Sequence, residues 1–258
     1  MVTNPGDHDD GTCSFRDCTL REAIHAANNA DGPNAIMMDP WFLQYVNGIS
    51  LNPALGTLIV TDSISITGPG ARKLYVSGEG AVRVFEFISG TSSVSGLTIA
   101  SGAITGASFG VPGDGGGVFN TATLTLTDCT FIGNEARGGG HTTAGGSGGS
   151  GNGGAVGNDG TLLLERCSFF QNRAFGGNGA NNTAVFGRGG AGGTGNGGAV
   201  FNYSGATLTV NNCTFAGNSG NGGTGGNGPA FAGGSGGNGY GGVINCSRRT
   251  PESLSKRC

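Results

Sequence analysis

The chain contains the stretch Thr123-Leu-Thr-Leu-Thr-Asp-Cys-Thr-Phe-Ile-Gly-Asn134 and repeats it as Thr161-Leu-Leu-Leu-Glu-Arg-Cys-Ser-Phe-Phe-Gln-Asn172 and as Thr207-Leu-Thr-Val-Asn-Asn-Cys-Thr-Phe-Ala-Gly-Asn218. The copies start 38 and then 46 residues apart, and no position inside the pattern shifts. In each copy apolar and polar residues alternate on both sides of a short break, which is the period of two expected of strands with one buried face. Each copy therefore predicts two short strands joined by a bend.

Glycine pairs followed by valine precede each copy of the repeat. They lie at 115–120, 153–158 and 197–202, and a fourth at 241–245 starts a further turn. If Val118, Val156, Val200 and Val243 point inward, each coil has three short strands. Strands this short cannot bury their own apolar face, so the coils must stack, and repetition of this kind is typical of a solenoid. The predicted fold is all-β, a triangular parallel β-helix with three-strand coils.

Three residue types recur around the second strand of each copy, and we expect each type to form a column along the solenoid. Free cysteine behaves as a small buried hydrophobe, whereas a metal or redox role needs convergent, accessible thiolates. The asparagines fall at a bend where left-handed backbone is tolerated and stacked amides can bond each other. The predicted structural ladder consists of Cys129, Cys167, Cys213, Phe131, Phe169, Phe215, Asn134, Asn172 and Asn218. Cys246 is a candidate extension of the cysteine column, and Cys258 has no assignment.

Glycine accounts for 57 of the 258 residues, and most of it lies after residue 100. Insertions of Gly, Ser, Thr, Asn and Ala at about 135–152, 173–196 and 219–240 leave the same corner of consecutive coils. Two interpretations are open. Flexible loops are favoured, because such sequence has little apolar area to offset the entropy of ordering glycine. Alternatively, the insertions pack side by side as extended, polyproline-II-like strands joined by backbone hydrogen bonds.

The first hundred residues predict a cap followed by less regular coils. Thr19-Leu-Arg-Glu22 is a capping box, and the apolar stripe after it predicts a short helix that ends between Asn28 and Gly32. A solenoid exposes its apolar interior at its ends, so this helix is well placed to close one end. We assign 1–34 to the cap, 35–246 to the β-helix and 247–258 to an unstructured tail. Strands are predicted at 35–38, 58–60, 64–67, 74–76, 82–88 and 94–99.

The segment Cys18-Thr-Leu-Arg-Glu-Ala-Ile24, with Ala-Ala-Asn28 soon after it, resembles the CSLREA domain of bacterial secreted and cell-surface β-helix proteins with a pectin-lyase-like fold. Arg83-Val-Phe85 and Ser95-Gly-Leu-Thr-Ile99 resemble the coils that follow this domain. The Gly-Gly-Ala-Val and Phe-x-x-Asn pairs are similar to repeats of polymorphic outer-membrane proteins, which are surface adhesins. The resemblance implies right-handed coils, as the rule for parallel crossovers also does, and an extracellular or cell-surface location. It implies no activity, because a fold does not carry one.

A location outside the cell would favour a disulfide in the cap. Cys13 and Cys18 flank a four-residue gap beside the helix, and in an exported protein a bridge between them would pin the loop to the cap. No signal peptide precedes Val2, and 247–258 carries no capping element. We therefore expect the sequence to be either a fragment or the product of a gene whose end is mis-predicted.

A carbohydrate-active enzyme is the alternative function, because β-helices often carry polysaccharide lyases and glycoside hydrolases. Lyases need a carboxylate cluster holding Ca²⁺ together with a base, and hydrolases need two carboxylates at a working separation. The acids and bases after residue 100 are few and do not align. We therefore expect no catalytic residues, and Arg83 with Glu86 is the best candidate pair.

Cofactors and other partners have weaker signals. Asp7, Asp9, Asp10 and Asp17 around Gly11 are interpreted as a solvated acidic turn, with a Ca²⁺ site as the second interpretation. A net charge of −3 with only two lysines argues against nucleic-acid binding. No apolar run approaches the roughly 20 residues of a membrane span.

These observations predict a non-catalytic exported scaffold that acts in adhesion or interaction through its glycine insertions. Loops on a rigid scaffold are where binding usually occurs. We expect the insertions to form one patch, rich in backbone donors and acceptors and nearly free of charge. Its partner would be a carbohydrate, a surface protein or a second copy of the chain.

Overall fold

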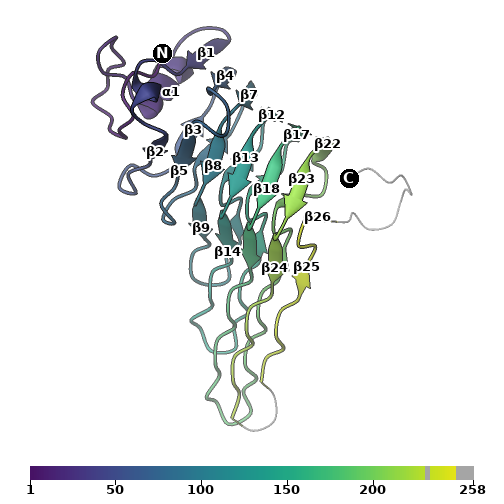
Figure 1. Cartoon of the computed structure of the whole chain (residues 1–258). Helices are drawn as coiled ribbons and strands as arrows, with labels where there is room; N and C mark the ends of the chain where they lie inside the picture. The colour runs from purple at the N-terminus through teal and green to yellow at the C-terminus, as the bar shows by residue number, and fades with distance from the viewer. Residues whose placement is uncertain (230–232, 248–258) are drawn as a thin grey trace.

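The computed structural model describes residues 1–229 and 233–247, which form a right-handed parallel β-helix. Strands of successive coils pair in parallel, and the coils stack from the N-terminal cap toward the C-terminal end of the chain (Figure 1). The helices among the described residues are α1 (Leu20–Asn28) and the short 3-10 helix η1 (Phe42–Gln44). None of the helices in this part of the chain is long and apolar enough to cross a membrane.

Three six-stranded sheets form the sides of the coils, and we name them after the residues they bury in the repeats. The leucine sheet consists of β1 (Asn34–Met37), β4 (Ile64–Thr67), β7 (Thr91–Ser95), β12 (Thr123–Thr127), β17 (Thr161–Glu165) and β22 (Thr207–Asn211). The phenylalanine sheet consists of β2 (Gly48–Ser50), β5 (Tyr75–Ser77), β8 (Thr98–Ala100), β13 (Thr130–Ile132), β18 (Ser168–Phe170) and β23 (Thr214–Ala216). The valine sheet consists of β3 (Leu58–Val60), β6 (Phe85–Phe87), β11 (Val118–Asn120), β16 (Val156–Asn158), β21 (Val200–Asn202) and β26 (Ile244–Cys246).

Two smaller sheets begin after β8, the third strand of the phenylalanine sheet, where the glycine-rich segments leave and rejoin the coils. The outgoing root sheet consists of β9 (Ala103–Thr105), β14 (Glu135–Arg137), β19 (Arg173–Phe175) and β24 (Ser219–Asn221). The returning root sheet consists of β10 (Gly113–Asp114), β15 (Gly151–Asn152), β20 (Gly195–Asn196) and β25 (Gly239–Tyr240). The three predicted strands of each coil are therefore present, and these later coils carry two further short strands that the sequence did not predict. The extra strands are only two or three residues long and polar or glycine-rich, so they carry no apolar alternation.

The interior columns predicted from the repeat are confirmed. The rings of Phe131 and Phe169 stack with centroids 4.7 Å apart and an interplanar angle of 6°, and Phe169 stacks on Phe215 at 4.8 Å and 8°. Cys129 and Cys167 are buried beside them, whereas Cys213 is half-buried. The hydrogen bond to Cys129, together with burial, raises the pKa of the Cys167 thiol. This column is packed core.

Two predictions for the last coil are wrong: the residue that points inward, and the column to which its cysteine belongs. Ile244, not Val243, pairs with Val200, and Val243 is exposed. In both coils one residue separates the glycine pair from the inward position. Val243 is therefore equivalent to Ala199, and Ile244 is equivalent to Val200. Cys246 lies opposite Asn202 in the valine sheet and does not extend the cysteine column. Cys258 and the predicted tail after Ser247 lie outside the described residues.

The asparagine ladder is confirmed, with one correction. The Asn134 side-chain amide donates to Asn172 Oδ1 at 2.9 Å, and Asn172 donates in the same way to Asn218 at 2.9 Å. The left-handed residues of this bend are the ones just before the asparagines, Gly133 (φ 64°) and Gln171 (φ 53°) among them. The asparagines are therefore needed for their hydrogen bonds and not for their backbone conformation.

A second, equally buried ladder runs along the valine sheet. Asn120 donates to Asn158 Oδ1 at 2.7 Å, and Asn158 donates to Asn202 Oδ1 at 2.6 Å. Each of these asparagines ends a Gly-Gly-x-Val-x-Asn marker in the sequence. The pattern alone did not show whether such an asparagine forms a ladder or only a turn.

The N-terminal cap forms as predicted. Thr19 is the N-cap of α1, and the reciprocal bonds of the capping box to Glu22 are both present. The helix packs against β1 and β3 at the first coil. Strands β3 and β4 have the predicted bounds, whereas β2 was missed because Ile49 is its only apolar residue.

We expect Phe169→Ala to lower the free energy of unfolding by about 3–5 kcal/mol, because it leaves a cavity between two stacked rings in a close-packed core. Phe186→Ala is the matched control, since that ring is 93% exposed and its loss should change stability by no more than about 0.5 kcal/mol. Urea unfolding measures both. Equal stability of the two variants would mean that the phenylalanine column is not core.

Candidate functional site

The glycine-rich segments project together from one corner of the β-helix as arms (Figure 1). We call residues 138–150, 176–194 and 222–238 the first, second and third arms, each with an outgoing and a returning limb. A shorter loop at 106–112, between β9 and β10, precedes them at the same corner. The prediction that the insertions leave one corner is confirmed, and the loop at 106–112 adds a member that the sequence did not reveal.

Backbone hydrogen bonds join the arms into a slab of two layers, the outgoing limbs in one and the returning limbs in the other. A continuous chain of bonds zigzags between the layers at 2.8–2.9 Å. It runs Gly139 N to Val111 O, Gly149 N to Gly139 O, Gly177 N to Gly149 O, Gly193 N to Gly177 O, Gly223 N to Gly193 O and Gly237 N to Gly223 O. Every limb between the two ends of this chain is bonded to two others, so the arms form an ordered layer.

The bonding pattern repeats three residues further out on the limbs. There Ala180 donates to Gly146 O, Gly190 to Ala180 O, Gly226 to Gly190 O and Gly234 to Gly226 O, at 2.7–2.9 Å. Three residues per turn is the period of the polyproline II helix. The favoured interpretation of flexible loops is therefore wrong, and the alternative of packed extended strands is right. Apolar area was the wrong criterion, because backbone hydrogen bonds and close contact hold this layer together.

Close approach of the backbones explains why glycine is needed here. A Cβ built on Gly193 would lie 1.8 Å from Gly149 O, and one on Gly177 would lie 2.2 Å from Gly139 O. Neither glycine has a left-handed backbone, so conformation alone would permit other residues. Most limb positions that face a neighbouring limb in this way are glycine, with the small Ala180 as an exception, and the positions between them carry the longer side chains.

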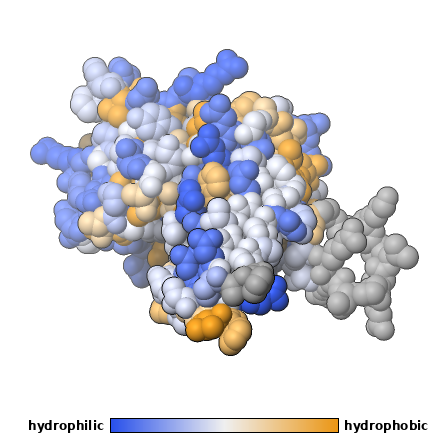
Figure 2. Space-filling model, turned by 90° about the horizontal axis from the view of Figure 1, so that it is seen from below, coloured by the Kyte–Doolittle hydropathy of each residue, from blue (hydrophilic) through white to orange (hydrophobic). Residues whose placement is uncertain are grey.

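The side chains at every third position cover the two faces of the slab. The outgoing face carries Asn178, Asn181, Thr224 and Asn227, and the returning face carries Ser147, Ser150, Ala191, Thr194, Ser235 and Asn238. Arg188 is the only Lys, Arg, Asp or Glu in the sequence of the arms. Seen from the arm ends, this part of the surface is mostly of intermediate hydropathy (Figure 2).

Free backbone donors are scarcer on the slab than the sequence suggested. The bonds between limbs use most of the glycine amides, and side-chain amides take others: Asn178 Oδ1 accepts from Thr224 N at 3.0 Å and Asn181 Oδ1 from Asn227 N at 2.7 Å. Short polar side chains, and not the backbone, are therefore the groups this surface offers to a partner.

An open groove of about 630 Å³ lies where the phenylalanine sheet meets the outgoing root sheet. Its lining includes the exposed ring of Tyr75, Ser77, Glu79, Ser101 and Glu135. These residues come from three different coils, so no local pattern in the sequence could have revealed them.

Each of the two groove carboxylates has a polar or charged partner in the protein. Hydrogen bonds from Ser77 and Ser50 lower the pKa of Glu79, with the Ser50 hydroxyl 2.8 Å from Oε1. Glu135 forms an ion pair with Arg137 at 2.8 Å. A glycosidase needs one carboxylic acid whose pKa is raised so that it can donate a proton, whereas the pKa of Glu79 is lowered.

Arg83 and Glu86 form an ion pair at 2.7 Å, as expected, but Arg83 is committed to the corner of the coil. Its other donors bond the carbonyls of Gly115 (3.0 Å) and Asp114 (2.8 Å), and its guanidinium lies over the ring of Phe119. Burial lowers the pKa of Arg83. The pair ties the valine sheet to the returning root sheet.

The three carboxylates of the calcium hypothesis face different partners. Asp7 is buried and paired with Arg21 at 2.8 Å, whereas Asp9 pairs with His25 at 2.9 Å. Asp10 accepts from the backbone and hydroxyl of Thr12. The residues present therefore do not bring Asp7, Asp9 and Asp10 to one point.

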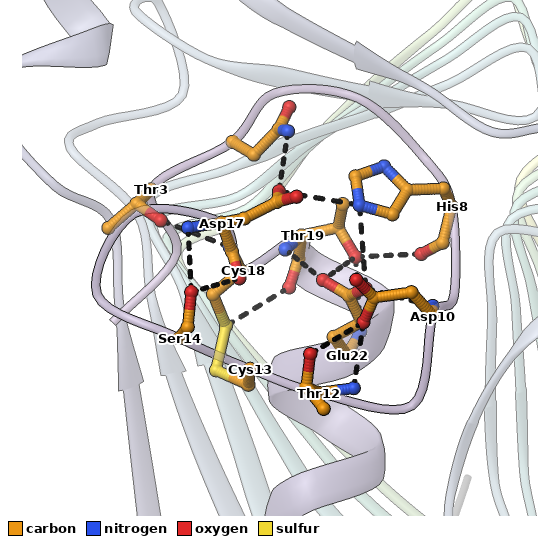
Figure 3. Close-up of a disulfide and its surroundings, with 11 residues drawn as sticks. Thr3, His8, Asp10, Thr12, Cys13, Ser14, Asp17, Cys18, Thr19 and Glu22 are labelled. Atoms are coloured by element: carbon orange, nitrogen blue, oxygen red, sulfur yellow. Dashed lines mark hydrogen bonds and ion pairs between the residues drawn. A yellow bond between two sulfur atoms is a disulfide. The ribbon is translucent and has the colours of Figure 1, made fainter.

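The predicted disulfide between Cys13 and Cys18 is present (Figure 3). Cys18 is buried at the start of the cap, and Cys13 lies in the exposed loop before it. The bridge holds the loop of residues 1–18 against the first turn of α1.

Comparison with family models, curated proteins and solved structures finds no match for this chain. The function must therefore be argued from the geometry described above.

We expect Gly193→Ala to destabilise the arms by about 1–3 kcal/mol, because the new methyl group must displace the Gly149 carbonyl. Gly236→Ala is the matched control: its Cβ would meet nothing closer than 3.9 Å. Amide hydrogen exchange at Gly177, Gly193 and Gly223 measures the difference. Unchanged protection in Gly193→Ala would show that the limbs do not pack in this way.

Proposed function

We propose that this protein is a non-catalytic extracellular or cell-surface scaffold that adheres through its arms and the groove at their roots. The slab of arms carries the proposal, because it is a rigid, flat, almost uncharged surface held out from the β-helix. Its regularly spaced amide and hydroxyl groups suit a neutral, hydroxyl-rich polymer such as a polysaccharide. The exposed Tyr75 ring supplies an apolar platform beside it.

Two further observations support an exported location. Disulfides such as Cys13–Cys18 persist mainly in oxidising compartments. On sequence grounds alone, the resemblance of residues 18–28 to the CSLREA domain of bacterial surface proteins points the same way. A surface protein or a second copy of this chain would be an alternative partner for the same face.

Shortening all three arms to brief turns should leave the β-helix folded and abolish adhesion. The columns of the core contain no arm residues, so circular dichroism should retain the β signal. The arms must be shortened together, because each is bonded to the next. Co-sedimentation with insoluble neutral and acidic polysaccharides, together with sedimentation velocity for self-association, measures the loss.

Exposed apolar side chains at the end of the second arm need a separate control. Val185 and Phe186 are 73% and 93% exposed, and the double variant Val185→Ser, Phe186→Ser leaves the limbs intact. This variant should still bind. If the shortened protein folds and binds normally, the adhesive face lies elsewhere on the coils.

The groove favours a second candidate function, cleavage of a glycan between Glu79 and Glu135. We expect no release of reducing or unsaturated ends from neutral or acidic polysaccharides, because hydrogen bonds from Ser77 and Ser50 lower the pKa of Glu79 and Glu135 is paired with Arg137. Release that disappears in Glu135→Gln or Glu79→Gln would establish the enzyme and overturn the scaffold proposal.

A further inference from the structure

A histidine and two carboxylates converge in the cap, away from the arms and the groove. His8 Nε2 lies 3.3 Å from Asp17 Oδ1 and 3.4 Å from Glu22 Oε1. The ligand-type atoms of the three residues all lie within 4.8 Å of one another. Figure 3 shows the three side chains pointing toward one another between the N-terminal loop and the start of α1.

The spacing of these atoms matches that of ligands on one metal ion. Two ligands bound to a tetrahedral ion with bonds of about 2.0–2.2 Å lie about 3.3–3.5 Å apart. An ordinary N–H···O bond is shorter, about 2.7–3.2 Å. The two contacts of His8 are thus slightly too long for good direct hydrogen bonds and close to the separation expected of two ligands on one ion.

Outer hydrogen bonds hold each ligand in place. Glu22 Oε2 accepts from the Thr19 backbone at 2.8 Å, and Oε1, which faces His8, also accepts from the Asp10 backbone at 3.1 Å. Asn4 donates to Asp17 Oδ1 at 2.8 Å, and the disulfide fixes Cys18, the next residue. Bonds of this kind orient metal ligands and are part of what makes a site selective.

Charge and access also favour a cation. Two carboxylates face one imidazole, and the Glu22 side chain is only 1% exposed, so a positive ion would offset the cost of holding that carboxylate away from water. The side chains of His8 and Asp17 are 41% and 46% exposed. An ion can therefore enter from solvent, and water can take a remaining position.

We propose that His8, Asp17 and Glu22 bind a divalent transition metal ion, with Zn²⁺ as the best fit. One imidazole nitrogen and two carboxylate oxygens are ligands that Zn²⁺ takes at these distances. Ca²⁺ needs six to eight oxygen ligands and does not suit this set. The bound ion joins the loop of residues 1–18 to the first turn of α1 and reinforces the disulfide at the end of the β-helix.

The test uses the full chain after treatment with a chelator, titrated with Zn²⁺ by calorimetry. We expect one Zn²⁺ ion to bind per chain. The melting temperature should rise with Zn²⁺ concentration, because binding to the folded state stabilises it. His8→Ala and Asp17→Asn should each weaken binding at least tenfold. Glu22 is not varied, since its loss would also remove the helix cap.

His25→Ala is the matched control. His25 also pairs with one carboxylate, Asp9, and is 46% exposed, but it lies outside the cluster, so its loss should leave Zn²⁺ affinity unchanged. Co²⁺ in place of Zn²⁺ should give visible d–d absorption without a thiolate charge-transfer band, which excludes the cysteines as ligands. Circular dichroism confirms that each variant is folded. The proposal is overturned if the wild type does not bind Zn²⁺, or if folded His8→Ala binds it as tightly as the wild type does.

Discussion

In-register parallel pairing between coils is the constraint on which the rest of this structure depends. Each coil lies on the next at the separation of neighbouring strands, about 4.8 Å, so every side chain meets its equivalent from the adjacent coil. Identical residues that attract one another at this distance are then favoured at every position. The stacked rings around Phe169 and the amide ladder through Asn172 are the result. A slip of one residue would turn every column to the other face.

The arms extend the same register beyond the core by different means. Their lengths differ, which accounts for most of the difference between the repeat spacings of 38 and 46 residues, yet their roots return to the same partners in the root sheets. Outside the core there is no apolar interior to bury, so backbone hydrogen bonds between limbs take over. Glycine costs entropy on ordering, but only a residue without Cβ lets the limbs come close enough for those bonds.

The N-terminal end and the side of the described solenoid serve different purposes. At the first coil, α1 and the disulfide-bonded loop cover the apolar interior and prevent edge pairing. The same loop brings His8, Asp17 and Glu22 together, so one small region combines a helix cap, a disulfide and a candidate metal site. The arms and groove lie along the side of the coils, where a long polymer could contact several repeats at once.

The sequence by itself determined the three main strands of the repeated coils and the columns of cysteine and phenylalanine inside them. The alternation of apolar and polar residues between Leu162 and Phe169 is a local property of the sequence. Its repetition at equivalent positions requires the coils to stack. Only the tertiary structure decided that the arms are ordered, that Tyr75, Glu79 and Glu135 share a groove, and that His8 reaches Asp17 and Glu22. These features depend on how closely separate segments approach one another, and that distance is set by packing and hydrogen bonding between segments, which residue type and spacing along the chain do not record.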